Sequence, residues 1–207
     1  MRYQLLYGTN NVGKIHYMQT CVQGLNIDIL SLSAMPFPAP EVLETGNTPL
    51  ENAKLKAWAY WHTYHTPCFS CDSGLYFVGL PDALQPGVHT RRVHGISLND
   101  EEMIVHYGML AKMHSPLKAY HKNAICFIMD EKHVYESDDS SLSTEHFLLV
   151  EQPHPKRLQG FPLDSLSVCC KTMQYYNDME QLIKNDSCQQ DGHYAFFKNA
   201  ISMYEKE

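Results

Sequence analysis

Five short segments of the sequence carry residue types that together could act on a phosphorylated ligand. They are Gly8-Thr-Asn-Asn-Val-Gly-Lys14, Glu44-Thr-Gly46, Glu51-Asn-Ala-Lys-Leu-Lys-Ala57, Asp72-Ser-Gly-Leu75, and Pro86-Gly-Val88 with Arg92. A glycine-rich turn before a helix offers backbone N–H groups to phosphate oxygens. Carboxylates can hold a hard divalent cation, while lysine and arginine neutralise phosphate charge. The series indicates metal-dependent chemistry on a nucleoside triphosphate.

The first segment has two competing interpretations. Its Gly8-x4-Gly13-Lys14 pattern nearly matches a P-loop, and Asp130 after an apolar run could be the acid that follows one. A P-loop needs a hydroxyl directly after the lysine to hold magnesium, and Ile15 stands there instead. This disfavours a P-loop ATPase and makes Asp130 a turn residue. Thr9, Asn11 and Lys14 still suit an anion site, although a plain strand-to-helix turn explains the segment equally well.

The carboxylates and lysines form the second group of candidates. We expect Asp72-Ser73-Gly74 to lie at the C-terminal end of a strand over 67–71, with another strand over 75–79. This is the edge at which α/β sheets usually bind ligands. Asp72 and Glu44 could then hold magnesium, whereas the competing interpretation is a polar turn. Lys54 and Lys56 lie two residues apart on one predicted helix. They point to different sides, so at most one faces the phosphates.

A zinc site is a further alternative for His62, His65, Cys68 and Cys71. The run crosses from a predicted helix through Pro67 into a strand. Because Cys68 and Cys71 are three residues apart in that strand, they point to opposite faces, which disfavours zinc. Cys169 and Cys170 are interpreted as small core or surface residues.

Hydrophobic periodicity and capping residues predict the strands and helices of an α/β protein. The length of 207 residues, without repeats or a clear linker, indicates that residues 1–207 form a single domain. Strands are expected over 2–7, 26–32, 67–71, 75–79, 119–130, 133–136 and 144–150. Helices are expected over 14–23, 48–65 and 97–113, with one or two more after Lys171 around a polar insertion at 185–191. Thr48, Pro49 and Glu51 form a strong helix start with a capping box.

Composition narrows the classes of protein. The formal charge of −7 disfavours binding of a long nucleic acid through its backbone. No apolar run reaches the roughly 20 residues of a membrane helix, so no membrane contact is expected. Seven cysteines without a secretory signal are expected to be reduced thiols in a cytoplasmic protein.

As an ordered set, these motifs resemble the Ham1 family, the inosine/xanthosine triphosphate pyrophosphatases that hydrolyse noncanonical purine nucleotides. The matching residues are Thr9-x-Asn11-x-x-Lys14, Glu44-Thr-Gly46, Glu51-Asn-Ala-x-x-Lys56-Ala57, Asp72-Ser-Gly-Leu75, Pro86-Gly-Val88 and Arg92. The resemblance implies a long mixed central sheet with flanking helices in two lobes around a nucleotide cleft, and a homodimer. It also implies that a nucleoside triphosphate and water give the monophosphate and pyrophosphate, with Mg²⁺ as cofactor.

The resemblance further implies roles for individual residues. Substrate binding is implied for Thr9, Asn11, Lys14, Lys56, Ser73, Gly74, Phe161, Asp164, Lys171 and His193. Catalysis is implied for Asp72 and Lys14, with Asp72 orienting or deprotonating the attacking water. Metal binding is implied for Glu44 and Asp72.

The sequence also departs from the family pattern. The family's Gly-Phe-Gly-Tyr-Asp-Pro stretch reads Gly160-Phe-Pro-Leu-Asp-Ser165, and its Ser-His-Arg reads Gly192-His-Tyr194, which removes an arginine expected at the purine. Cys71 and Tyr17 replace acidic residues. These departures keep a second hypothesis open: a catalytically weak nucleotide-binding protein derived from this family.

Overall fold

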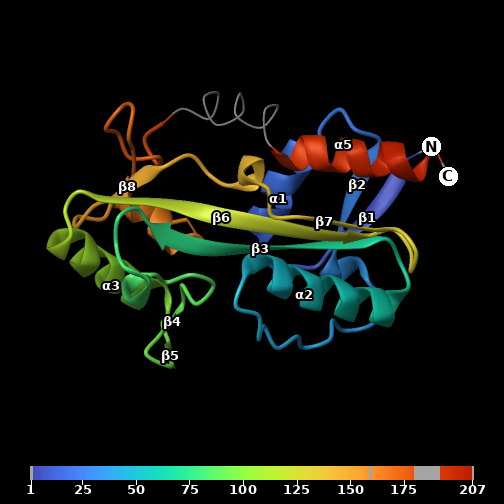
Figure 1. Cartoon of the computed structure of the whole chain (residues 1–207), viewed down its shortest axis with the longest axis horizontal. Coiled ribbons are helices and arrows are strands. Elements are labelled where there is room, and N and C mark those ends of the chain that lie inside the picture. Colours follow the sequence, from blue (N-terminus) through green and yellow to red (C-terminus); the bar gives the residue numbers. More distant parts are fainter. Residues whose placement is uncertain (1, 159, 180–191, 207) are drawn as a thin grey trace. The chain divides into compact units, whose positions relative to one another are not determined.

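The computed structural model describes residues 2–158, 160–179 and 192–206 (Figure 1). In chain order the elements are β1 (Tyr3–Tyr7), α1 (Val12–Cys21), β2 (Ile27–Ser31), η1 (Leu32–Ala34), α2 (Pro49–Tyr64), β3 (Cys68–Phe77), η2 (Asp82–Leu84), β4 (Arg92–Val93), β5 (Ile96–Ser97), α3 (Asp100–Met113), β6 (Leu117–Ile128), β7 (Val134–Ser137), η3 (Ser140–Leu142), β8 (Phe147–Leu149), η4 (Pro162–Leu166), β9 (Ser167–Cys169) and α5 (Gly192–Tyr204). The predicted insertion at 185–191 lies outside the described residues.

A long mixed sheet runs through the described residues, as expected. Its strand order is β2-β1-β3-β6-β8-β9, with β7 also paired to β6. Strand β1 pairs in parallel with β2 and with β3. The pairs β6–β7, β6–β8 and β8–β9 are antiparallel. The chain divides into two compact units, one within 1–73, 122–143 and 185–207, and one within 74–121 and 144–184.

In the first unit, helices cover both faces of the sheet. Figure 1 shows α1 and α5 on one face and α2 on the other. Strand side chains alternate between these faces: Leu5 and Tyr7 pack with Met18 of α1 and Phe197 of α5, whereas Leu6 packs against α2. The period of two that defines a strand therefore supplies two apolar cores from the same strands.

Helix α2 begins where the sequence predicts, because Thr48 accepts a hydrogen bond from the Glu51 N–H at 3.2 Å and Pro49 occupies the first turn. The expected capping box is wrong in one arm. The Glu51 carboxylate accepts from the Asn47 N–H at 2.7 Å rather than from Thr48, so it ties down the loop one residue earlier. The helix ends at His65, whose left-handed φ of 46° stops the helix.

In the second unit, α3 packs on the sheet through Met103, Ile104 and Tyr107. It begins at a complete capping box, in which Asn99 and Glu102 bond each other's backbone N–H groups. The short hairpin of β4 and β5 and the strand β9 were not expected from the sequence. They are two or three residues long, too short for a periodic pattern to show.

One predicted break in the sheet is wrong. The expected strands over 67–71 and 75–79 form the single strand β3, so Asp72 lies inside a strand and not at its end. Gly74 does not make a sharp turn. A Cβ atom at Gly74 would lie 3.1 Å from the Gly87 carbonyl, and Leu75 exchanges two backbone hydrogen bonds with Gly87. The glycine therefore serves the close approach of two backbones.

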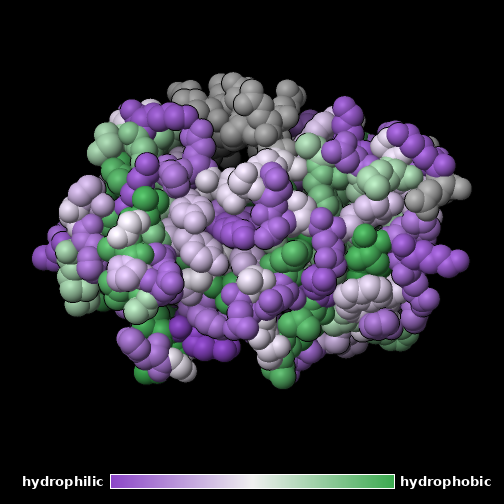
Figure 2. Space-filling view, viewed as in Figure 1, coloured by the Kyte–Doolittle hydropathy of each residue, from purple (hydrophilic) through white to green (hydrophobic). Residues whose placement is uncertain are grey.

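The surface over α2 and the loop before it carries hydrophobic patches among hydrophilic ones (Figure 2). Phe37, Leu43 and Leu55 are exposed apolar side chains of this region. Exposed apolar side chains are common on the surfaces of folded proteins. Among the described residues, no helix has the length and hydrophobicity that crossing a membrane needs.

Gly8 provides a test of the packing beneath α2. A Cβ atom at Gly8 would lie 2.4 Å from the Tyr60 ring and 2.7 Å from the Ser70 hydroxyl. We therefore expect Gly8→Ala to lower the free energy of unfolding by about 1–3 kcal/mol, measured by urea denaturation. In a Tyr60→Leu background the same change should cost less. An equal cost in both backgrounds would place the strain elsewhere.

Candidate active site

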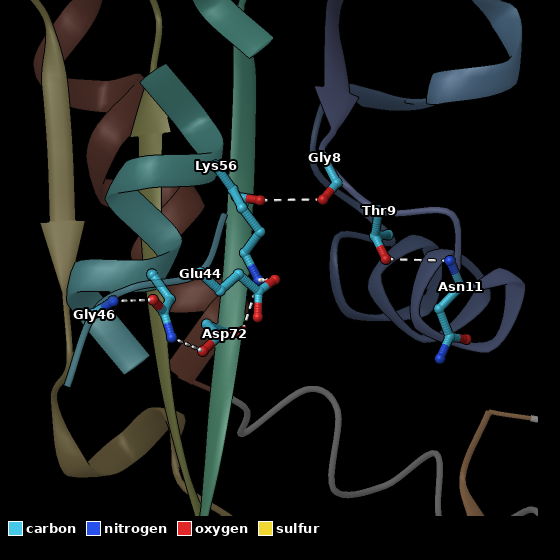
Figure 3. Close-up of polar contacts among 9 residues, drawn as sticks. Gly8, Thr9, Asn11, Glu44, Gly46, Lys56 and Asp72 are labelled. Carbon is cyan, nitrogen blue, oxygen red and sulfur yellow. Dashed lines mark hydrogen bonds and ion pairs between the residues drawn. The ribbon is translucent and has the colours of Figure 1, made fainter. Parts of the chain in front are cut away.

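A buried lysine lies at the centre of the candidate site in the first unit. The Lys56 ammonium is 2.6 Å from Oδ1 of Asp72 and 3.0 Å from Oε1 of Glu44. The side chains of Lys56 and Asp72 are each 10% exposed, and that of Glu44 is 47% exposed. Figure 3 shows Lys56 reaching from α2 toward both carboxylates. Three residues predicted from separate segments thus form one charged cluster.

Helix geometry explains why Lys56 and not Lys54 takes this place. The buried positions of α2 include Ala53, Lys56, Ala57 and Tyr60, which follow helical spacing along one stripe. Lys54 lies off this stripe and forms an exposed ion pair with Glu136 at 2.9 Å. The prediction that the two lysines point to different sides of the helix is confirmed, and which of them faces phosphate stays a prediction.

Strand β3 presents its polar side chains to α2. Cys68, Ser70 and Asp72 alternate along β3: the Cys68 thiol donates to the Ala57 carbonyl on α2, and the Ser70 hydroxyl donates to the Gly8 carbonyl at 3.2 Å. The latter bond links β3 to the turn after β1. The alternation therefore brings Asp72 and the Gly8 turn to the same side of the sheet.

Asn52 was missed as a site residue in the sequence. Its side chain is buried, accepts a hydrogen bond from the Gly46 N–H at 2.8 Å, and donates one to Oδ2 of Asp72 at 3.3 Å. It thereby connects the loop that carries Glu44 to the carboxylate of β3. The available signal was its position, four residues before Lys56 on the buried stripe, where a polar side chain needs a partner.

The glycine-rich turn uses its side chains to start α1. The Asn11 side chain accepts from the Lys14 N–H, and Thr9 Oγ1 accepts from the Asn11 N–H, both at 3.2 Å. The Thr9 bond is drawn in Figure 3. The helix that follows has no acidic residue in its first turn. The N-terminus of α1, with Lys14 in its first turn, is therefore a positively charged end.

The two site lysines have opposite pKa shifts. Burial, followed by the charge of Lys56, lowers the pKa of Lys14, against weaker opposition from Asp72. Burial also tends to lower the pKa of Lys56, but the charges of Asp72 and Glu44 outweigh it and raise this pKa above its ordinary value. Lys56 is thus held firmly as a cation, while Lys14 gives up its proton more readily.

Cys71 faces away from this cluster. It packs against the core formed with α1 and α5, and it hydrogen-bonds Tyr7. Burial and this contact raise the pKa of Tyr7 well above its ordinary range, so the phenol stays neutral. A thiol suits the apolar neighbours that Cys71 has in this core.

Two other predicted site residues of the first unit, Ser73 and His193, lie in different environments. Ser73 follows Asp72 on β3 and is half-buried. His193 begins α5, is 3% exposed, and packs edge-on against the ring of Tyr17. Tyr17 replaces an acid of the family pattern. Its aromatic contact is therefore with His193, a residue predicted to bind the substrate.

The remaining predicted residues belong to the second unit. Phe161 precedes η4, Asp164 lies in its first turn, and Gly74 pairs with the Gly87 segment as described above. Lys171 is exposed and forms an ion pair with Glu145 at 2.9 Å, which raises the pKa of the lysine. Arg92 is exposed on β4.

The zinc alternative fails on geometry. Within the described residues, no three His, Cys, Asp or Glu side chains gather as a ready metal site. Cys68 faces α2 and Cys71 faces the opposite core, as strand alternation predicts. Burial raises the pKa of Cys68 to about 12, which opposes the thiolate that zinc requires. Asp130 is a turn acid, since it accepts hydrogen bonds from Lys132 and His133.

A divalent cation, by contrast, fits the chemistry of the Lys56 cluster. Two carboxylates from different segments, Glu44 and Asp72, already converge on one positive charge. Carboxylate oxygens are the ligands that Mg²⁺ and similar hard ions prefer, and Mg²⁺ usually takes one or two of them together with phosphate oxygens. In this structure both carboxylates are paired with the Lys56 ammonium.

Comparison with known proteins decides the family. A model of the Ham1 family matches residues 5–187. The chain belongs to the Ham1 family. Its elements also match those of solved Ham1 proteins. A HAM1 protein from Coxiella burnetii superposes with a TM-score of 0.71 at 20% identity, covering 98% of this chain and 99% of that one. The Staphylococcus aureus Ham1 protein gives a TM-score of 0.64 at 20% identity, with 98% of each chain covered.

Curated relatives are named for one activity. A dITP/XTP pyrophosphatase from Leptospira interrogans serogroup Icterohaemorrhagiae serovar copenhageni is 29% identical over 187 residues, which cover 89% of this Ham1 chain and 90% of the relative. The dITP/XTP pyrophosphatase of Methylococcus capsulatus is 35% identical over 106 residues, half of each chain. The first of these relatives is similar to the present chain over most of its length, and the second over half of it.

Asn52 supplies a test of how the site is held together. We expect Asn52→Leu to lower the free energy of unfolding by about 1–3 kcal/mol, because the Gly46 N–H and one Asp72 oxygen lose their partner in a buried place. Urea denaturation measures this loss. Lys54→Leu, which breaks only an exposed ion pair on the same helix, should cost less than about 1 kcal/mol. Equal effects would mean that Asn52 has no special part in the cluster.

Proposed function

We propose that this Ham1 chain hydrolyses noncanonical purine nucleoside triphosphates, such as dITP and XTP, to the monophosphate and pyrophosphate. The single observation that carries this proposal is the cluster of Lys56, Glu44 and Asp72 in a chain of the Ham1 family. The cluster lies near Lys14, which follows the glycine-rich turn. The names of the similar proteins support the choice of purine substrate.

The residues of the first unit suit both the binding of the triphosphate and the attack of water on it. Lys14 and Lys56 are placed to neutralise the triphosphate, and the N–H groups at the start of α1, with Thr9 and Asn11 shaping the turn, suit phosphate oxygens. Glu44 and Asp72 would hold Mg²⁺, which when bound neutralises phosphate charge and polarises the phosphorus–oxygen bond. Asp72 is fixed by Asn52 and would orient the attacking water or accept its proton.

In the second unit, we propose that Phe161 stacks on the base and that Gly74, Asp164 and Lys171 contact the substrate. In the first unit, we propose substrate contacts for Ser73 and His193. Tyr194 replaces the arginine of the family pattern and lacks its fixed pair of donors, so the preferred base is expected to differ from that of relatives with the arginine. We also propose that residues 1–207 form one catalytic domain that assembles as a homodimer in the cytoplasm.

The test is a product assay with Mg²⁺ across ITP, dITP, XTP and the four common triphosphates, in which pyrophosphate and orthophosphate are scored separately. Pyrophosphate from dITP, ITP or XTP is the expected product, since attack at the α-phosphorus releases it. Orthophosphate as the main product would contradict the proposal. Nucleotide binding without any product would favour the alternative, a catalytically weak nucleotide-binding protein.

Asp72 provides the test of mechanism. We expect Asp72→Asn to lower kcat about 10²–10⁴-fold, the range for loss of a general base, while the circular dichroism spectrum stays that of wild type. Asp28→Asn is the matched control, because Asp28 forms a surface ion pair with Arg2. A kcat within a few-fold of wild type for Asp72→Asn would exclude the assigned role.

The lowered pKa of Lys14 predicts how activity depends on pH. As pH rises, Lys14 loses its proton before an ordinary lysine would at 10.5, and the site loses a positive charge for the triphosphate. We therefore expect kcat/KM, which reports groups of the free enzyme, to fall with rising pH below 10.5. Lys14→Arg should keep its charge and remove this fall. A fall of the same size in Lys14→Arg would assign it to another group.

A further inference from the structure

The ammonium of Lys56 contacts the same carboxylate oxygen atoms that a divalent cation would need as ligands. Oδ1 of Asp72 lies 2.6 Å from Lys56 Nζ, and Oδ2 accepts a hydrogen bond from Asn52 at 3.3 Å. Both oxygens of Asp72 are therefore bound by protein groups. Oε1 of Glu44 lies 3.0 Å from the same ammonium. The two carboxylates thus already have a cation, and a second one must compete with it.

The charges of the site make this competition depend on phosphate. Lys14, Lys56, Glu44 and Asp72 carry two positive and two negative formal charges, which balance. A divalent cation alone would add two positive charges beside two lysines, and a triphosphate alone would add several negative charges beside two carboxylates. Unbalanced charge is costly where the side chains are poorly solvated, as those of Lys56 and Asp72 are. Bound together, the cation and the triphosphate each offset charge that the other adds, so each lowers the electrostatic cost of binding the other.

The two lysines differ in what they can offer to phosphate. Lys14 forms no ion pair within the described part of the chain, so its charge is available without any rearrangement. Lys56 must first leave its carboxylates. Its partner Glu44 is half-exposed and lies in a segment without regular structure between η1 and α2. The flexible stem of Lys56 and the solvent access of Glu44 make such an exchange sterically simple.

We propose that Lys56 is an internal counter-cation for Glu44 and Asp72, which it releases when a polyphosphate draws its ammonium away. The carboxylates then become free for a divalent cation. Metal and triphosphate consequently strengthen each other's binding, and by linkage the strengthening is equal in both directions. Lys56 is in this view a positioning residue that couples the two ligands, in addition to contacting phosphate. The inference rests on the proposed function for the identity of the polyphosphate.

Mn²⁺ binding to the protein without nucleotide tests the inference, with free Mn²⁺ measured by electron paramagnetic resonance. Lys56→Gln removes the competing charge, so we expect it to bind Mn²⁺ at least about tenfold more tightly than wild type, within the usual range of coupling between sites. Lys54→Gln makes the same chemical change on the same helix and should match wild type, because Lys54 pairs with Glu136 instead. Unchanged or weaker Mn²⁺ binding by Lys56→Gln would overturn the inference.

Two further measurements guard against a variant that does not fold. Lys56→Met fills the same space without a buried amide, and circular dichroism identifies the variants that fold like wild type. In wild-type protein, lysines are acetylated with acetic anhydride and counted by peptide mass spectrometry, with and without Mn²⁺ at its measured half-saturation. Displacement of Lys56 should raise its acetylation relative to Lys54. An unchanged ratio contradicts the inference without any variant.

These outcomes are separable from those of the product assay. If dITP is hydrolysed to pyrophosphate but Mn²⁺ affinity is the same in wild type and the Lys56 variants, the counter-cation role is wrong and the proposed function stands. If Mn²⁺ affinity rises in the Lys56 variants but no triphosphate is hydrolysed, the counter-cation role is supported and the proposed function fails.

Discussion

The buried ion pair between Lys56 and Asp72 is the constraint on which the first unit depends. Two charges with 10% exposure each must face one another, since a buried charge without its partner is strongly destabilising. This requirement fixes the rotation of α2 about its axis and the register of β3. A shift of β3 by one residue would bring Cys71 to α2 and bury Asp72 in the apolar core on the other side.

The alternation of β3 separates the site from the core. Ser70 and Asp72 face α2, where they bind Gly8, Lys56 and Asn52. Phe69 and Cys71 face the core with α1 and α5. A departure from the family pattern at Cys71 therefore alters the apolar side of the strand, beside Tyr7, and leaves the Lys56 cluster intact. The same separation explains why one strand can supply both packing and chemistry.

Hydrogen bonds from a few polar side chains attach the loop before α2, which has no regular structure, to the elements beside it. Asn52 joins Gly46 to Asp72, and Glu51 holds Asn47, so the loop containing Glu44 is attached to the first turns of α2. Glu44 can thus reach Lys56 although no helix or strand contains it. The loop depends on α2 for its position, and this dependence relates the capping of a helix to the geometry of a candidate site.

Much of the fold could be predicted from the sequence, because periodicity and caps are local signals. The helix over 49–64, with Thr48 as its N-cap, and the strands around 3–7 and 27–31 were predicted to within one or two residues. The continuous strand β3 was not predicted, because the pair Ser73-Gly74 is locally typical of a turn. Only the nearby backbone of Gly87 shows why a glycine is needed there. The strands β4, β5 and β9 are too short for any periodic signal.

By itself, the sequence determined which residue types could do chemistry, the order of the motifs and hence the family. It also determined that Lys54 and Lys56 leave α2 on different sides, because the helical repeat alone sets the angle between them. Only the tertiary structure decided which of these sides meets β3, that Asn52 bridges Gly46 and Asp72, and that Glu44 shares a lysine with Asp72. The physical reason is that local periodicity fixes where a side chain lies on its own element. What lies opposite depends on the packing of segments distant in the chain.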